Sequence, residues 1–104
     1  MSKIFLYVEF QTSQDFTELD IEEINAQMKA FPGLLSKTWL SGIGNNSLGG
    51  FYEWDSLENV QNYIDNYLAP GMKTYGSLTV KLFNGDIVRD ASIGMSSPFY
   101  NQDS

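Results

Sequence analysis

Aromatic rings lie close to a few charged side chains in this sequence. The stretch Gly49–Trp54, GGFYEW, sets two glycines directly before three rings. Such rings either pack in a core or stack on a flat ligand, and residues without side chains leave room for either. We therefore expect Trp39, Tyr52 and Trp54 either to line a cavity beside a sheet or to be ordinary core residues, with the glycines completing a hairpin turn.

The composition excludes several classes of chemistry. The chain has no His and no Cys, so a His base, a thiolate metal site and a disulfide are impossible. Its 13 acidic and 6 basic residues give a net charge of −7, which repels phosphate and anionic lipid. Neither nucleic acid nor a membrane is an expected partner.

Two further segments have a simple interpretation. The acidic run 18–23 lies where acids stabilise a helix start and lacks the spacing of a calcium loop, so we expect no metal. The opening MSKIFLYVEF is too short and too alternating for a signal peptide or membrane span. We expect a cytoplasmic protein.

Hydrophobic spacing predicts the order strand, helix, strand, strand, helix, strand. The strands are expected over residues 3–10, 34–41, 48–54 and 78–83. The first helix would be capped by Asp15 or Thr17, and the second would begin at Asp55. Two right-handed crossovers joined by a hairpin place both helices on one face of a four-stranded antiparallel sheet, the ferredoxin-like α+β fold.

We expect one domain over residues 1–104, with a partly irregular tail after about residue 84. The last residues, SSPFYNQDS, are expected to be loosely held. Ile87, Val88 and Ile93 are apolar enough to dock on a second subunit.

The other face of the predicted sheet has no helix to cover it. Alternation assigns aliphatic residues to the helix side: Ile4, Leu6, Val8, Leu78, Val80 and Leu82. It assigns a mixture of rings and charges to the uncovered side: Phe5, Tyr7, Glu9, Lys37, Trp39, Ser41, Tyr52, Trp54, Thr79, Lys81 and Phe83. This mixture fits neither a solvated face nor a closed core, so we expect a second copy of the chain to cover it in a homodimer.

Three segments resemble the YdhR-like family of putative mono-oxygenases: PGLLSKTW, GGFYEWDSLENVQNYIDNYL and VKLFN. The likeness spans roughly residues 6–84, and its most specific pieces are Pro32, Gly33, Lys37, Trp39, Gly49, Gly50 and Tyr52. The resemblance implies a dimeric α+β barrel. The wider superfamily includes cofactor-free mono-oxygenases, lactone isomerases and haem enzymes with a His ligand, and the absence of His excludes the haem branch.

The resemblance implies a cofactor-independent mono-oxygenase that acts on a small phenolic or quinol-like compound between sheet and helices. Under it, Glu9 or Glu53 is the candidate base and Lys37 or Lys81 would hold the substrate anion. The rings expected to bind substrate are Tyr7, Trp39, Tyr52, Trp54 and Phe83.

Other interpretations of these residues stay open. Glu9 would equally form a cross-strand ion pair with Lys37 or Lys81, and Glu53 would face solvent or a partner. The alternative function is a non-catalytic dimeric module that binds a small apolar molecule or a protein by the same face.

Overall fold

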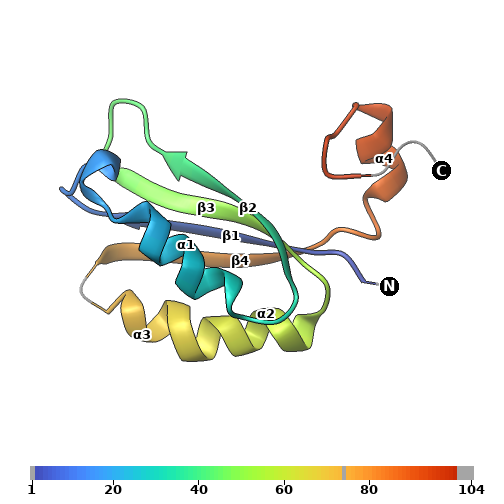
Figure 1. Cartoon of the computed structure of the whole chain (residues 1–104). Helices are drawn as coiled ribbons and strands as arrows, with labels where there is room; N and C mark the ends of the chain where they lie inside the picture. Colours follow the sequence, from blue (N-terminus) through green and yellow to red (C-terminus); the bar gives the residue numbers. More distant parts are fainter. Residues whose placement is uncertain (1, 74, 101–104) are drawn as a thin grey trace.

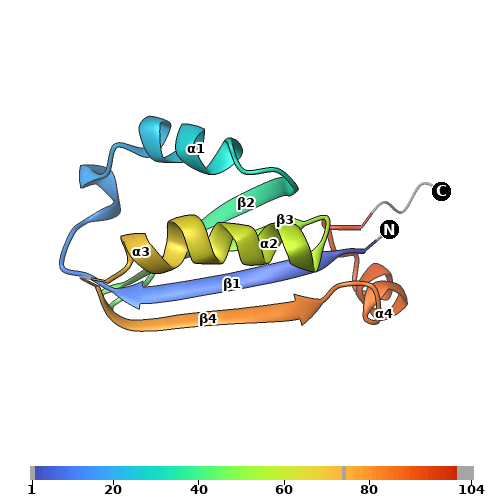
Figure 2. The ribbon, with the colours of Figure 1, turned by 90° about the horizontal axis from the view of Figure 1, so that it is seen from below.

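A computed structural model describes residues 2–73 and 75–100. The elements, in chain order, are β1 (Ile4–Gln11), η1 (Phe16–Glu18), α1 (Ile21–Lys29), β2 (Leu34–Ser41), β3 (Ser47–Trp54), α2 (Leu57–Tyr63), η2 (Ile64–Leu68), α3 (Ala69–Gly71), β4 (Gly76–Asn84) and α4 (Arg89–Gly94). The strands form one antiparallel sheet in the order β2-β3-β1-β4. Helices α1, α2 and α3 lie on the same side of it (Figures 1 and 2). The predicted ferredoxin-like α+β fold is confirmed.

Both helices that cover the sheet begin later than the sequence predicts. Asp15 caps the short 3₁₀ turn η1, and the carboxylate of Asp20 caps α1 by accepting a backbone N–H at 3.2 Å. In the second helix the Ser56 hydroxyl is the N-cap, one residue after the predicted Asp55. Short polar side chains satisfy the free N–H groups of a first helical turn. Each helix start has several such residues close together in the sequence, so the sequence alone did not identify the one that caps.

Strand register decides which side chains face the helices. In the β1–β3 pair, Leu6 lies opposite Tyr52 and Ile4 lies opposite Trp54. Directly opposite residues of an antiparallel pair point to the same face. Tyr52 and Trp54 are therefore in the core beneath the helices, only 2% and 0% exposed. The prediction that they belong to the uncovered face is wrong.

The same correction applies to β2. A β-bulge between Leu34 and Ser36 adds one residue to this strand, so that Lys37 lies opposite Tyr52 and faces the helices. Trp39 follows two residues later on the same face. The predicted placement of Lys37 and Trp39 on the uncovered face is wrong, because the bulge shifts the alternation by one residue.

The uncovered face holds six residues of the predicted mixture. Ser41 is not among them, because it lies opposite the buried Leu48 and faces the helices like Trp39. Phe5 lies opposite Phe83, Tyr7 opposite Lys81, and Glu9 opposite Thr79. From β3 the same face receives the side chains that point away from the helices, Phe51 and Glu53.

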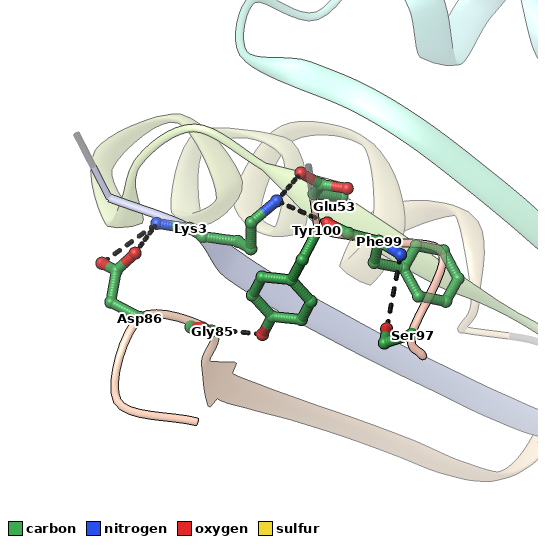
Figure 3. Close-up of polar contacts among 7 residues, drawn as sticks. All are labelled: Lys3, Glu53, Gly85, Asp86, Ser97, Phe99 and Tyr100. Atoms are coloured by element: carbon green, nitrogen blue, oxygen red, sulfur yellow. Dashed lines mark hydrogen bonds and ion pairs between the residues drawn. The ribbon is translucent and has the colours of Figure 1, made fainter. Parts of the chain in front are cut away.

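The end of the chain folds back onto one end of this face (Figure 3). The Phe99 ring packs against Phe5 and Phe51, with centroid separations of 5.9 and 5.1 Å. The Lys3 ammonium pairs with Glu53 and donates a hydrogen bond to the Phe99 carbonyl at 2.8 Å.

Tyr100 completes this contact and is 7% exposed. Its hydroxyl donates to the Gly85 carbonyl at 2.7 Å (Figure 3). The prediction of loosely held last residues is wrong up to Tyr100, and positions 101–104 lie outside the described residues. Ile87 and Val88 are 81% and 43% exposed.

Candidate active site

An apolar cavity of about 110 Å³ lies between the sheet and the helices. β1, β2 and β3 form one wall, and α1, α2 and η2 form the other. Among the described residues, one charged side chain lines this cavity, Lys37, and the rings around it are Phe10, Trp39, Tyr52, Tyr63, Tyr67 and Tyr75. Such a site suits a flat apolar ligand with one polar group.

The Lys37 amine lies against two of these rings. Its Nζ is 3.4 Å from the ring centroid of Trp39 and 4.6 Å from that of Tyr52. It donates a hydrogen bond to Met28 Sδ at 3.2 Å, a weak acceptor. The ion pairs among the described residues use Lys3 and Arg89, so Lys37 has no carboxylate beside it there. Burial lowers the pKa of Lys37 from 10.5 to about 7.

Gly50 makes room for this amine. A Cβ at Gly50 would lie 2.5 Å from Lys37 Cε, closer than such atoms approach, and 3.2 Å from Tyr52 Cε1, which is a tight contact. At Gly49 a Cβ would lie 1.9 Å from the carbonyl oxygen of Val8 on the neighbouring strand. The glycine pair therefore does more than complete the hairpin, because it admits Lys37 to the space beside the rings.

Tyrosine hydroxyls form the other polar part of the site. The hydroxyls of Tyr52 and Tyr63 are hydrogen-bonded at 3.2 Å. Burial raises the pKa of Tyr52 to about 12 and raises the pKa values of Tyr63 and Tyr67 as well. These hydroxyls keep their protons near neutral pH, so they donate hydrogen bonds and are poor bases.

The π-helical segment η2 supplies part of the helix-side wall. Tyr67 lies within it and stacks on Tyr63, with a centroid separation of 5.4 Å and an interplanar angle of 26°. Tyr63 and Tyr67 were not among the residues predicted for the site, and the signal that could have indicated them is their separation of one helical turn on a face rich in rings. π-Helical turns occur frequently at functional sites.

The two tryptophans differ in position. Trp39 lines the cavity, and its Nε1 donates to Asn25 Oδ1 of α1 at 3.0 Å. Trp54 is fully buried, packs against Tyr63 and is not part of the cavity wall. Its Nε1 is a buried donor with no hydrogen-bond partner among the described residues.

Glu9, one of the two candidate bases, faces away from the cavity. It accepts hydrogen bonds from the hydroxyls of Tyr7 and Ser47. These bonds, the Tyr7 bond first, lower the pKa of Glu9, and the bond to Glu9 raises the pKa of Tyr7. A lowered pKa makes a carboxylate a weaker base.

Glu53, the second candidate base, pairs with Lys3 on the same uncovered face. Lys81 and Phe83 of β4 also lie on this face. Of the residues predicted for the site, the structure brings Lys37, Trp39 and Tyr52 together at the cavity. It places Trp54 beside them in the core, and it separates Tyr7, Glu9, Glu53, Lys81 and Phe83 from them by the thickness of the sheet.

The sequence of this chain matches the model of one known protein family. A family model described as "Putative mono-oxygenase ydhR" matches residues 5–92. The chain belongs to this family. The match includes the residues that the ydhR resemblance rested on, Lys37, Trp39 and the glycine pair among them.

Solved structures share the fold of this ydhR-family chain. A protein of unknown function from Nitrosomonas europaea, NE2512, superposes with a TM-score of 0.64 at 16% identity, covering 81% of this chain and 89% of its own. A putative monooxygenase from Shewanella loihica PV-4 superposes with a TM-score of 0.58 at 22% identity, covering 81% of this chain and 95% of its own. SnoaB, a cofactor-independent oxygenase from Streptomyces nogalater, superposes with a TM-score of 0.58 at 17% identity, covering 81% of this chain and 93% of its own. No curated protein matches the sequence.

Within 2–73 and 75–100, no helix has the length and apolar character needed to cross a membrane. Over the same residues, no group of three His, Cys, Asp or Glu side chains is placed to hold a metal ion.

Proposed function

We propose that the protein is a cofactor-independent mono-oxygenase whose substrate is a one-ring phenolic or quinol-like compound bound between sheet and helices. The observation that carries the proposal is the Lys37 amine, held beside the Trp39 and Tyr52 rings in the wall of the cavity. Membership of the ydhR family supports the class of reaction.

The size of the cavity supports a small substrate. Its volume is about 110 Å³, and an apolar cavity of roughly 150 Å³ is known to admit benzene. One ring is therefore the scale of ligand that this site accepts, and a fused polycyclic compound exceeds it.

In this proposal Lys37 takes the role that the sequence suggested for Glu9 or Glu53. With its pKa near 7, part of the Lys37 population is neutral and accepts the proton of a bound phenol. The ammonium that results stabilises the phenolate. The electron-rich ring then reacts with O₂: one oxygen atom becomes a ring carbonyl and the other leaves as water. For phenol the balance is phenol + O₂ → benzoquinone + H₂O, and the substrate supplies all the electrons.

Oxygen consumption tests the proposal. We expect purified protein to consume one O₂ per quinone formed from a one-ring phenol or quinol, above the rate without protein. Lys37→Met should lower this rate at least about tenfold, because it removes the base and the cation. Lys81→Met on the uncovered face is the matched control and should leave the rate unchanged. Equal rates for the two variants, or no uptake above background, would contradict the proposal.

A non-catalytic binding module is the second candidate. It is favoured by one observation: no carboxylate lines the cavity among the described residues. Quenching of tryptophan fluorescence by a phenol without oxygen uptake would support this alternative.

We also propose a homodimer that packs through the uncovered sheet face. Phe83 and Leu40 on that face are 49% and 37% exposed, and the C-terminal residues cover one end of it only. Exposed rings grouped on one face favour an interaction surface.

A further inference from the structure

The position of Lys37 also suits a reaction that does not involve oxygen. We propose that the Lys37 amine is a nucleophile that forms a reversible imine with a one-ring aromatic aldehyde bound in the cavity. This inference rests on the cavity and the amine alone. It stands whether or not the protein is an oxygenase.

Burial without a counter-charge activates an amine. Lys37 is surrounded by Trp39, Tyr52 and Met28, and its amine donates a hydrogen bond to the thioether sulfur of Met28. Desolvation in such surroundings favours the neutral amine, which is the nucleophilic form. Lys29, Lys73 and Lys81 are exposed and lack such apolar surroundings, so we expect them to react far more slowly.

The reaction balances without an oxidant or reductant. The amine nitrogen attacks the aldehyde carbon, a C–N bond forms, and the carbonyl electron pair moves to oxygen. The nitrogen loses both of its protons, the oxygen leaves as water, and a C=N bond remains: RNH₂ + R′CHO → RN=CHR′ + H₂O.

The other titratable groups around the cavity favour this step. They are tyrosines: Tyr52 from β3, Tyr63 from α2, Tyr67 from η2 and Tyr75 from the segment before β4. The pKa values of the first three are raised by burial, so these hydroxyls carry protons throughout the neutral range. They add no negative charge that would keep Lys37 protonated, and they offer O–H donors to the departing oxygen.

Reductive trapping of the imine tests the inference. Full-length protein is incubated with benzaldehyde and cyanoborohydride at pH 7.5, and labelled peptides are mapped by mass spectrometry. We expect Lys37 to be labelled at least about tenfold more than the exposed Lys29, Lys73 or Lys81, because desolvation of the Lys37 amine favours its nucleophilic neutral form. The extent of Lys37 labelling should rise with pH about a midpoint near 7. The peptide map also separates Lys37 from the amino terminus, whose amine is partly neutral at this pH.

Two controls keep the test independent of mutant folding. Toluene, one ring without a carbonyl, should protect Lys37 from labelling in the unaltered protein and leave the exposed lysines unaffected. Lys37→Arg should lose the label at this position and Lys81→Arg should keep it. The inference would be overturned if all lysines were labelled to the same extent, or if toluene did not reduce the labelling of Lys37. Because oxygen consumption is not measured, failure here is distinct from failure of the proposed oxygenase.

Discussion

Lys37 shows how two opposing effects set the state of one residue. The neighbouring Trp39 and Tyr52 rings attract the ammonium, and such contacts contribute about 0.5–2 kcal/mol. A fall of the Lys37 pKa from 10.5 to about 7 corresponds to a desolvation cost of about 4–5 kcal/mol. Desolvation is the larger effect, so the rings hold the amine in place without keeping it fully charged.

This balance makes stability depend on pH in a defined window. Between the folded pKa of about 7 and the unfolded value, the unfolded chain holds a proton that the folded chain has released. The contribution of Lys37 to stability should therefore rise with pH from about 7 towards 10.5, by up to about 1.4 kcal/mol per pH unit. Below pH 7 the amine is protonated in both states, so this contribution no longer changes with pH. Lys37→Met should lack this rise. Urea denaturation of both proteins at pH 6 to 9 measures it, and identical pH dependence would refute the assigned burial of the amine.

The two tryptophans should respond differently to a ligand. Trp39 lines the cavity and Trp54 does not. With phenol as the probe, we expect Trp39→Phe to abolish ligand-induced fluorescence quenching and Trp54→Phe to retain most of it. Fluorescence titration of the two single-tryptophan proteins makes the comparison. Quenching that persists in Trp39→Phe would place the ligand elsewhere.

At the scale of elements, the start of β3 controls access to Lys37. Gly50→Ala puts a Cβ 2.5 Å from Lys37 Cε and must displace the amine from the rings. We expect benzaldehyde labelling of Lys37 to fall at least about tenfold in this variant. Gly94→Ala in α4, where a Cβ meets no atom within 4 Å, is the matched control and should label normally. Unchanged labelling in Gly50→Ala would show that the close packing around the amine has no part in its reactivity.

The sequence predicted the elements better than their faces. Where residues 4–9 of β1 pair with residues 79–84 of β4 the alternation is regular, and it correctly assigned Phe5 and Phe83 to the uncovered side. In β2 the bulge after Leu34 shifts the alternation, which the residue types do not reveal. In β3 the glycines carry no side chain, so only the pairing with β1 fixes the side to which Tyr52 points.

The same reasoning explains what was missed in the site. Strand alternation placed Lys37 on the uncovered sheet face, and its residue type gave no sign that it would lie beside rings on the helix side. Its burial depends on an absent side chain at Gly50 and on rings from two strands, which are known only once the register is known. Lys37, Trp39 and Tyr52 could be chosen as candidates by type, but their common cavity could not.

At the scale of the molecule, the uncovered sheet face should determine the oligomeric state. Phe83 projects from it and is 49% exposed. We expect Phe83→Asp to convert the proposed homodimer to a folded monomer, because a charge would be buried without a partner at the interface. Ile43→Asp, at a position 96% exposed in the turn between β2 and β3, is the control and should leave the dimer intact.

Light scattering with circular dichroism distinguishes the possible results. A folded Phe83→Asp dimer would argue against this face as the interface. A monomeric unaltered protein would refute the dimer itself.

The strand order β2-β3-β1-β4 has a consequence for how the chain folds. The hairpin of β2 and β3 closes a short loop, so it can form early. The central strand β1 pairs only with strands that are remote in sequence, since Ile4 lies opposite Trp54 on one side and Asn84 on the other. Closing such long loops costs chain entropy before any contact repays it, and folding slows as contacts become less local. During synthesis, β1 leaves the ribosome before β3 and β4 and is therefore among the last of these strands to find both of its neighbours.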